Sequence, residues 1–209
     1  MTGGLVALLL LVILLQGVWH AFALIPDGDL DGAHLYHGWL IVTRQLSLYA
    51  DEMTGHRTPL AYWLIGGSQV LWGPSLLAGR LASFGAGFVG LILLWRGTTR
   101  ALGRETGLLA LALVAASPYL TAHTATAGFQ GLCLFWVGLG VWSWSGGSRL
   151  GVLGCAWGLF LTRPQFGLLI PLAWFWARRT SGRRVDLALV APAVAFWLAF
   201  WPVKMVAYV

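Results

Sequence analysis

Residues 27–63 read DGDLDGAHLYHGWLIVTRQLSLYADEMTGHRTPLAYW, and they hold most of the polar chemistry of the chain. Five of the seven acidic residues fall in this stretch, beside basic and imidazole side chains suited to binding or proton transfer: Asp27, Asp29, Asp31, Asp51, Glu52, His34, His37, Arg44, His56 and Arg57. The sequence on either side is mainly apolar. We therefore interpret the stretch as a polar loop that the rest of the chain holds at one face of a membrane.

The composition excludes an ordinary soluble domain. Of the 209 residues, 58% are hydrophobic and only 10% are charged, and several apolar runs approach the roughly 20 residues that cross a bilayer. The 28 glycines and 13 tryptophans suit close helix packing and anchoring at the membrane surface. The net charge of +6 does not indicate a nucleic-acid partner, because the arginines cluster between apolar runs, as orientation signals do. Cys133 and Cys155 lie inside apolar runs and show neither a disulfide framework nor metal spacing.

The apolar runs predict an all-α, polytopic transmembrane bundle of about seven spans. The first, residues 4–25, is expected to stay uncleaved, because no basic region precedes it and its apolar core exceeds the usual length of a signal peptide. The others are expected at 77–95, 106–122, 127–144, 150–162, 165–177 and 187–203. We expect one transmembrane domain over 1–209, made of a first span (1–25), an outer acidic loop (26–76) and the remaining spans (77–209).

Two helices are expected inside the outer loop. Asp31 is placed to cap an amphipathic helix that continues to about Leu46 and lies at the membrane interface. Residues 59–72, PLAYWLIGGSQVLW, are too few to span and are expected to be interfacial or re-entrant.

The basic residues predict the orientation. With a cytoplasmic N-terminus, the outer loop is extracytoplasmic, for example periplasmic, and carries a charge of about −3 from two arginines and five acids. Eight of the 13 basic residues then fall in cytoplasmic connections: Arg96, Arg100, Arg104, Arg149, Arg178, Arg179, Arg183 and Arg184.

Each candidate site residue has two readings. The aspartates are either solvated loop residues or a carboxylate that takes a proton from an acceptor hydroxyl or holds a divalent cation, although the DGDLD spacing lacks the glycine and glutamate of a calcium loop. His34 and His37 share a helix face, which fits a metal or a polar interface; a divalent cation is allowed but not indicated. Arg57, Arg80 and Arg163, on the outer side, either bind an anionic phosphate or extend to the membrane surface.

Several motifs occur in an order that resembles a known family. These are Asp29-Leu-Asp31-Gly, a segment with Tyr36 and Trp39, and then LSLYADEMTGHRTPLAYWL and LWGPSLLAGRLASFGAG. They resemble the N-terminal half of the C-type, multi-span glycosyltransferases, which include protein mannosyltransferases and aminoarabinose transferases. The resemblance covers about residues 25–180, including LGRETGLLALALVAASPYL and GLFLTRPQFGLLIPL, and its matching positions are Asp31, Tyr49, Asp51, Arg57-Thr58-Pro59-Leu60, Gly73, Ser75 and Arg80.

The resemblance implies transfer of a sugar from a polyprenyl-phosphate carrier to an acceptor at the outer membrane face. Asp31 would be the general base, with Asp29 as the alternative. Physical reasoning makes the three outer arginines candidates for the carrier phosphate, and Tyr36 and Tyr49 are candidate substrate contacts. The expected partners are membrane lipids, the sugar donor and other membrane subunits, and no nucleic acid.

Two departures from the family support an alternative. Family enzymes continue with further spans and often a soluble outer domain, and Gln130 stands where relatives frequently carry an acid. The alternative is a non-catalytic subunit that retains this fold within a larger membrane complex. A transporter fits less well, because the expected spans contain few ionisable residues.

Overall fold

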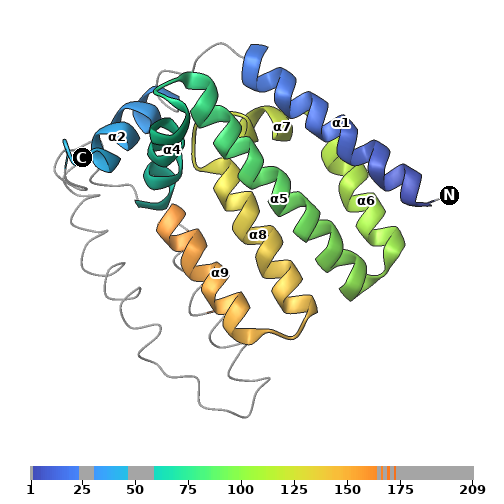
Figure 1. The fold of residues 1–209 in the computed structure, drawn as a ribbon. Coiled ribbons are helices and arrows are strands. Elements are labelled where there is room, and N and C mark those ends of the chain that lie inside the picture. The colour runs from blue at the N-terminus through green and yellow to red at the C-terminus, as the bar shows by residue number, and fades with distance from the viewer. Residues whose placement is uncertain are drawn as a thin grey trace, which may run out of the picture.

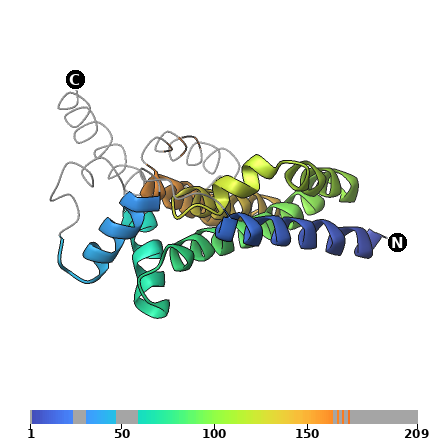
Figure 2. The same cartoon turned by 90° about the horizontal axis from the view of Figure 1, so that it is seen from above.

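The computed structural model of the chain describes residues 2–23, 31–46 and 59–163, with Phe166, Leu169 and Leu172 beyond them. Figure 1 shows α1, α6, α5, α8 and α9 side by side, with α2, α4 and α7 at one end. Figure 2 shows that α4 stands across the end of this layer. The all-α class is confirmed, and the described residues form α1 (Thr2–Ala23), α2 (Ala33–Val42), α4 (Pro59–Trp72), α5 (Leu76–Leu102), α6 (Arg104–Ala115), α7 (Pro118–Thr124), α8 (Gln130–Ser145) and α9 (Arg149–Thr162).

Two described helices are long and apolar enough to cross a membrane, within α1 over Gly3–Ala23 and α5 over Leu76–Leu102. A third span results if α6 and α7 count as one bent pair. These helices indicate an integral membrane protein. The expected seven spans are not established, because α8 and α9 have only 16 and 14 residues and the segments expected at 165–177 and 187–203 lie outside the continuously described part.

The span expected at 106–122 is not one straight helix. α6 ends at Ala115, α7 begins at Pro118, and the two helices are bent by 77°. Proline lacks the N–H that would continue the helical ladder, and it disfavours helical backbone at the residue before it. The apolar run therefore turns at Ala116 and Ser117 instead of continuing.

The two helices expected in the outer loop were predicted with mixed success. α4 has the predicted bounds. α2 ends at Val42, four residues before the expected end, because Arg44 adopts a left-handed backbone with φ of 59°. The prediction that Asp31 caps this helix is wrong, since Gly32 is its N-cap and makes no side-chain capping bond.

The close contact between α5 and α8 depends on glycines. A Cβ atom on Gly90 would lie 2.5 Å from the backbone oxygen of Leu134, and one on Gly87 would lie 3.2 Å from the Cα of Gly131. A Cβ atom on Gly138 would likewise overlap the backbone of Gly90. Small residues let two helix backbones approach closely, and here they bring the N-terminal turns of α5 and α8 to the same end of the bundle.

α1 packs against the remaining helices through apolar contacts and through the polar side chain of Gln16. Its Ile13 is fully buried in an apolar cluster with Leu91 and Leu111. The Gln16 side chain donates to the Ala115 carbonyl at 3.2 Å and accepts from Thr121 Oγ1 at 3.4 Å. Gln16 therefore holds α1 at the corner between α6 and α7.

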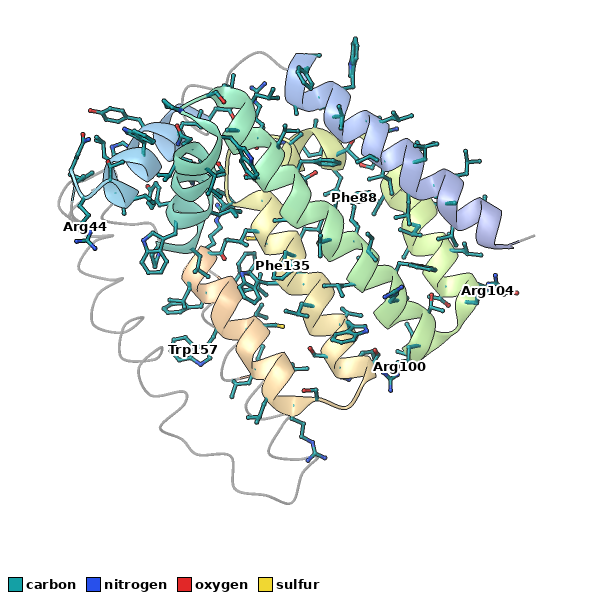
Figure 3. All side chains as sticks on the ribbon, in the orientation of Figure 1. Arg44, Phe88, Arg100, Arg104, Phe135 and Trp157 are labelled. Atoms are coloured by element: carbon teal, nitrogen blue, oxygen red, sulfur yellow. The ribbon has the colours of Figure 1, made fainter. Side chains whose placement is uncertain are left out.

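α5 carries an arginine near each of its ends. Arg80 is in its second turn, and Arg100 is in its last turn. Twenty residues of α-helix rise about 30 Å, which is the thickness of the hydrocarbon core. Figure 3 shows Arg100 and Arg104 at the end of the bundle away from α2 and Arg44.

We expect Gly90→Leu to destabilise the protein, because its side chain must push the α8 backbone away. Overpacking of this kind costs roughly 1–3 kcal/mol or more, and the variant should melt several degrees below wild type in mild detergent. Gly85→Leu is the matched control on the same helix, because nothing lies within 4 Å of its Cβ position. Equal melting temperatures for the two variants would contradict the close α5–α8 contact.

Candidate functional site

A buried ion pair joins four segments at the end of the bundle where α2, α4 and α7 lie. Arg80 Nη2 donates to Asp31 Oδ2 at 2.6 Å, and each side chain is only 1% exposed. The other carboxylate oxygen, Oδ1, accepts from the backbone N–H of Ala127 at 2.5 Å. Arg80 Nη1 donates to the carbonyl of Ala21 at 3.2 Å. The pair thus ties the start of α2 to α5, to the end of α1 and to the segment before α8.

Local sequence brings Arg80 to this position. Ser75 caps α5, its Oγ accepting from the Ala78 N–H at 3.1 Å, and this fixes where the helix begins. Arg80 then falls in the second turn on the face toward α8. One turn later, Ser83 Oγ donates to the Gly128 carbonyl at 3.2 Å, so the segment that binds Asp31 is also bonded to α5.

The Asp31 carboxylate meets the demands of buried charge. Removing an ion from water costs several kcal/mol, and attraction offsets this cost only where geometry is good and the remaining polar atoms are bonded. Here both Asp31 oxygens accept hydrogen bonds, one of them charge-assisted. The Asp31 carboxylate is therefore held in one place by two donors, one from Arg80 of α5 and one from Ala127 in the segment before α8.

Aromatic rings lie next to the ion pair. His34, one turn after Asp31, is 2% exposed, and its ring centroid lies 5.4 Å from that of the buried Tyr62 and 6.0 Å from that of Phe129. The guanidinium carbon of Arg163 lies 4.2 Å from the centroid of the Phe129 ring. These rings extend from the buried contact between α2 and α4 to Arg163 at the end of α9.

A cation above a ring face has a defined geometry. The ring attracts the flat face of the guanidinium, whereas the N–H donors lie in the guanidinium plane. Arg163 meets the Phe129 ring through this kind of contact. The donor edge of a guanidinium matches the oxygens of a phosphate group.

The structure pairs two residues that the sequence marks as candidates, Asp31 and Arg80, and places a third, Arg163, at the same end of the bundle through Phe129 and His34. Arg80 is hydrogen-bonded to Asp31 and to a backbone carbonyl. Direct contact with a phosphate would require these hydrogen bonds to break. Tyr36, on α2, is 63% exposed. The remaining candidates lie outside the described residues: Asp29, Tyr49 and Arg57.

The expected shared face of His34 and His37 is confirmed, and it faces inward. Both residues are buried, and His37 Nδ1 lies 2.9 Å from the Ala33 carbonyl oxygen. Among the described residues, no three His, Cys, Asp or Glu side chains come together as a metal site.

Sequence reasoning missed part of the site. Tyr62, Phe129 and the Ala127 N–H carried no distinctive signal, because their roles depend on packing between distant segments. Gln69 is another such residue: it is buried and its Nε2 donates to the Leu35 carbonyl at 2.9 Å, which locks α4 onto α2. Gln130, expected to replace an acid, has a buried amide oxygen without a hydrogen-bond partner in the described part of the chain.

A search against protein families finds the domain described as dolichyl-phosphate-mannose-protein mannosyltransferase over residues 56–208, well over half of the chain. The chain belongs to this family. Searches among curated proteins and among solved structures found no match. The matched range of the mannosyltransferase domain includes Arg57, Arg80 and Arg163, whereas Asp29 and Asp31 precede it. Membership of the mannosyltransferase family confirms the predicted resemblance and makes the chain a glycosyltransferase-like membrane protein.

The buried pair predicts strong coupling between its two residues. Asp31→Leu or Arg80→Met alone leaves an unpaired buried charge, which costs about 3–5 kcal/mol. The double variant leaves no such charge, so its loss of stability should be far smaller than the sum of the two single losses. Melting temperatures of the four proteins in one detergent check this, and additive losses would contradict a direct buried pair.

Proposed function

We propose that the protein transfers a sugar from a polyprenyl-phosphate donor to an acceptor hydroxyl at the end of the bundle that carries Asp31 and Arg80. Family membership implies this class of donor. The observation that carries the proposal is the meeting of an ionisable carboxylate and two arginines, Arg80 and Arg163, at one end of the helices. That end is expected to face the extracytoplasmic side, because the arginines at the other end of α5 are typical of cytoplasmic connections.

The reaction needs two kinds of group. The acceptor oxygen forms a bond to the anomeric carbon of the sugar, while the bond from that carbon to the carrier phosphate breaks. A carboxylate accepts the hydroxyl proton, and cationic donors stabilise the negative charge that develops on the departing polyprenyl phosphate. Arg163, which is partly exposed and lies over the Phe129 ring, is the candidate for the second role, and Arg57 is the further candidate from the sequence.

The burial of Asp31 changes the preferred assignment of the base. Asp31 was the first choice from the sequence, but both of its oxygens accept hydrogen bonds and it is 1% exposed. Asp29 lies outside the described residues, yet two peptide units keep its Cα within about 7 Å of the Asp31 Cα. We propose Asp29 as the general base and the Asp31–Arg80 pair as the structure that positions it.

The two proposed roles predict different effects when each aspartate is substituted. Asp29→Asn should abolish transfer while leaving the melting temperature and donor binding close to wild type. Asp31→Asn should lower the melting temperature as well as transfer, because it weakens the buried pair. Transfer is measured with a polyprenyl-phosphate mannose donor and membrane extract as the source of acceptor. An active Asp29→Asn protein would contradict the assignment.

The proposed phosphate ligand has its own test. Arg163→Ala should weaken binding of polyprenyl phosphate by about 10-fold or more, since a hydrogen bond to a charged group contributes about 1.5–3 kcal/mol. Native mass spectrometry of the protein in detergent measures the bound lipid. Arg100→Ala, at the opposite end of α5, is the control and should bind normally. Equal binding by both variants would argue against Arg163.

The same measurements address a second candidate function, a non-catalytic subunit of a membrane complex. The observation in its favour is Gln130, a neutral amide at the site whose buried oxygen has no hydrogen-bond partner in the described residues. A non-catalytic subunit should bind no polyprenyl phosphate and should purify in a fixed ratio with other membrane proteins. A partner requirement for transfer would instead appear as activity that only the assembled complex shows.

A further inference from the structure

Four arginines from α5, α6 and α9 gather at the end of the bundle opposite the ion pair, and we call them the basic end: Arg96, Arg100, Arg104 and Arg149. Figure 3 shows Arg100 and Arg104 at this end, and they and Arg96 are exposed. Among the described residues, the one acid at this end is Glu105, and none of these three exposed arginines forms an ion pair. The basic end is therefore a surface of positive charge that the described chain does not neutralise.

Helix packing brings the segments of the basic end together. A Cβ atom on Gly97 of α5 would lie 2.7 Å from the backbone nitrogen of Trp142, so the last turns of α5 and α8 are in close contact. Nη1 of Arg100 lies 3.5 Å from the Cβ position of Gly146, in the turn between α8 and α9. That turn leads directly into Arg149, the first residue of α9. The α5 arginine thus lies over the loop that carries the α9 arginine.

Local helix energetics do not account for these charges. Arg96 and Arg100 are four residues apart on α5, a spacing at which like charges destabilise a helix. Arg104 and Arg149 are the first residues of α6 and α9, where the helix dipole disfavours a cation. Of the four, Arg100 in the last turn of α5 is the one whose position suits the dipole. An anion bound at this end would offset both the repulsion between the α5 arginines and the unfavourable dipole interactions.

The depth of the basic end in a membrane indicates which anion is available. Trp142 and Trp144, in the last turn of α8, are 44% and 46% exposed, and indole rings favour the level of the lipid headgroups. Arg100 follows Arg80 by 20 residues on α5, a rise of about 30 Å, which is the thickness of the hydrocarbon core. The arginines therefore lie at the level of the phosphates of one leaflet.

We propose that the basic end binds the phosphate headgroups of anionic phospholipids. Guanidinium groups donate paired N–H bonds to phosphate oxygens, and clusters of arginine beside membrane helices attract anionic lipids. A zwitterionic headgroup carries its own ammonium group, so its net attraction to the basic end is weaker. This binding is independent of sugar transfer, because it uses residues at the end of α5 that is far from Asp31 and Arg80.

The test compares two lipids by native mass spectrometry of the full chain. The protein is presented with phosphatidylglycerol or phosphatidylcholine at equal mole fraction in the same detergent micelles. Wild type should retain phosphatidylglycerol at least about 10-fold more than phosphatidylcholine, because only the first headgroup carries a net negative charge. A triple variant with Arg96→Gln, Arg100→Gln and Arg104→Gln should retain the two lipids equally. Melting temperatures verify that the variant folds, as expected for substitutions of exposed side chains.

Two control variants make the result specific to the basic end. Arg44→Gln removes an exposed arginine near α2, at the other end of the bundle, and should keep the wild-type preference for phosphatidylglycerol. Arg163→Ala should also keep this preference while it loses polyprenyl phosphate. Failure of the lipid proposal and failure of the proposed function are therefore distinguishable.

Four results would overturn the inference. Equal retention of both lipids by wild type would identify them as ordinary surrounding lipid. A wild-type preference in the triple variant would place the binding elsewhere. Loss of the preference in Arg44→Gln as well would show that it depends on the charge of the whole molecule. Displacement of phosphatidylglycerol by millimolar inorganic phosphate would show that the basic end is a site for free anions.

Discussion

A carboxylate and a guanidinium that are almost completely removed from solvent restrict how the rest of this protein can pack. Neither Asp31 nor Arg80 is stable in an apolar environment alone, so every segment that surrounds them must supply either the opposite charge or a hydrogen bond. The carbonyl of Ala21 and the N–H of Ala127 meet this demand. The end of α1 and the segment between α7 and α8 are thereby fixed relative to α2 and α5, although long stretches of sequence separate them.

The glycine contacts make this geometry possible. α5 and α8 approach closely enough for Ser83 to bond the Gly128 carbonyl, and that bond positions the backbone that caps the Asp31 carboxylate. The next residue, Phe129, packs against His34 and Arg163. Close helix packing, charge pairing and the contact of Arg163 with Phe129 are thus three consequences of one arrangement. In a transferase, such an arrangement gives a fixed framework to groups that act on a mobile lipid substrate.

Local signals in the sequence predicted the elements better than their contacts. Pro59 starts α4, and Gly73, with φ of 86°, follows its end, so both bounds could be predicted. The end of α2 was missed because an arginine, not a glycine, adopts the left-handed conformation there. The bend at Pro118 was missed because the apolar run continues through it. Asp31 and Arg80 were both marked as functional, but their pairing across 49 positions depends on tertiary packing that one sequence does not display.

The central claim is that Asp31 organises the end of the bundle where α2, α4 and α7 lie, through contacts with distant segments. Hydrogen–deuterium exchange, followed by mass spectrometry on Asp31→Asn and wild type in the same detergent, tests it most directly. The account predicts faster exchange in peptides that cover residues 124–129 as well as in α2, with no change in α9. Faster exchange confined to the residues next to Asp31, with residues 124–129 as protected as in wild type, would contradict it.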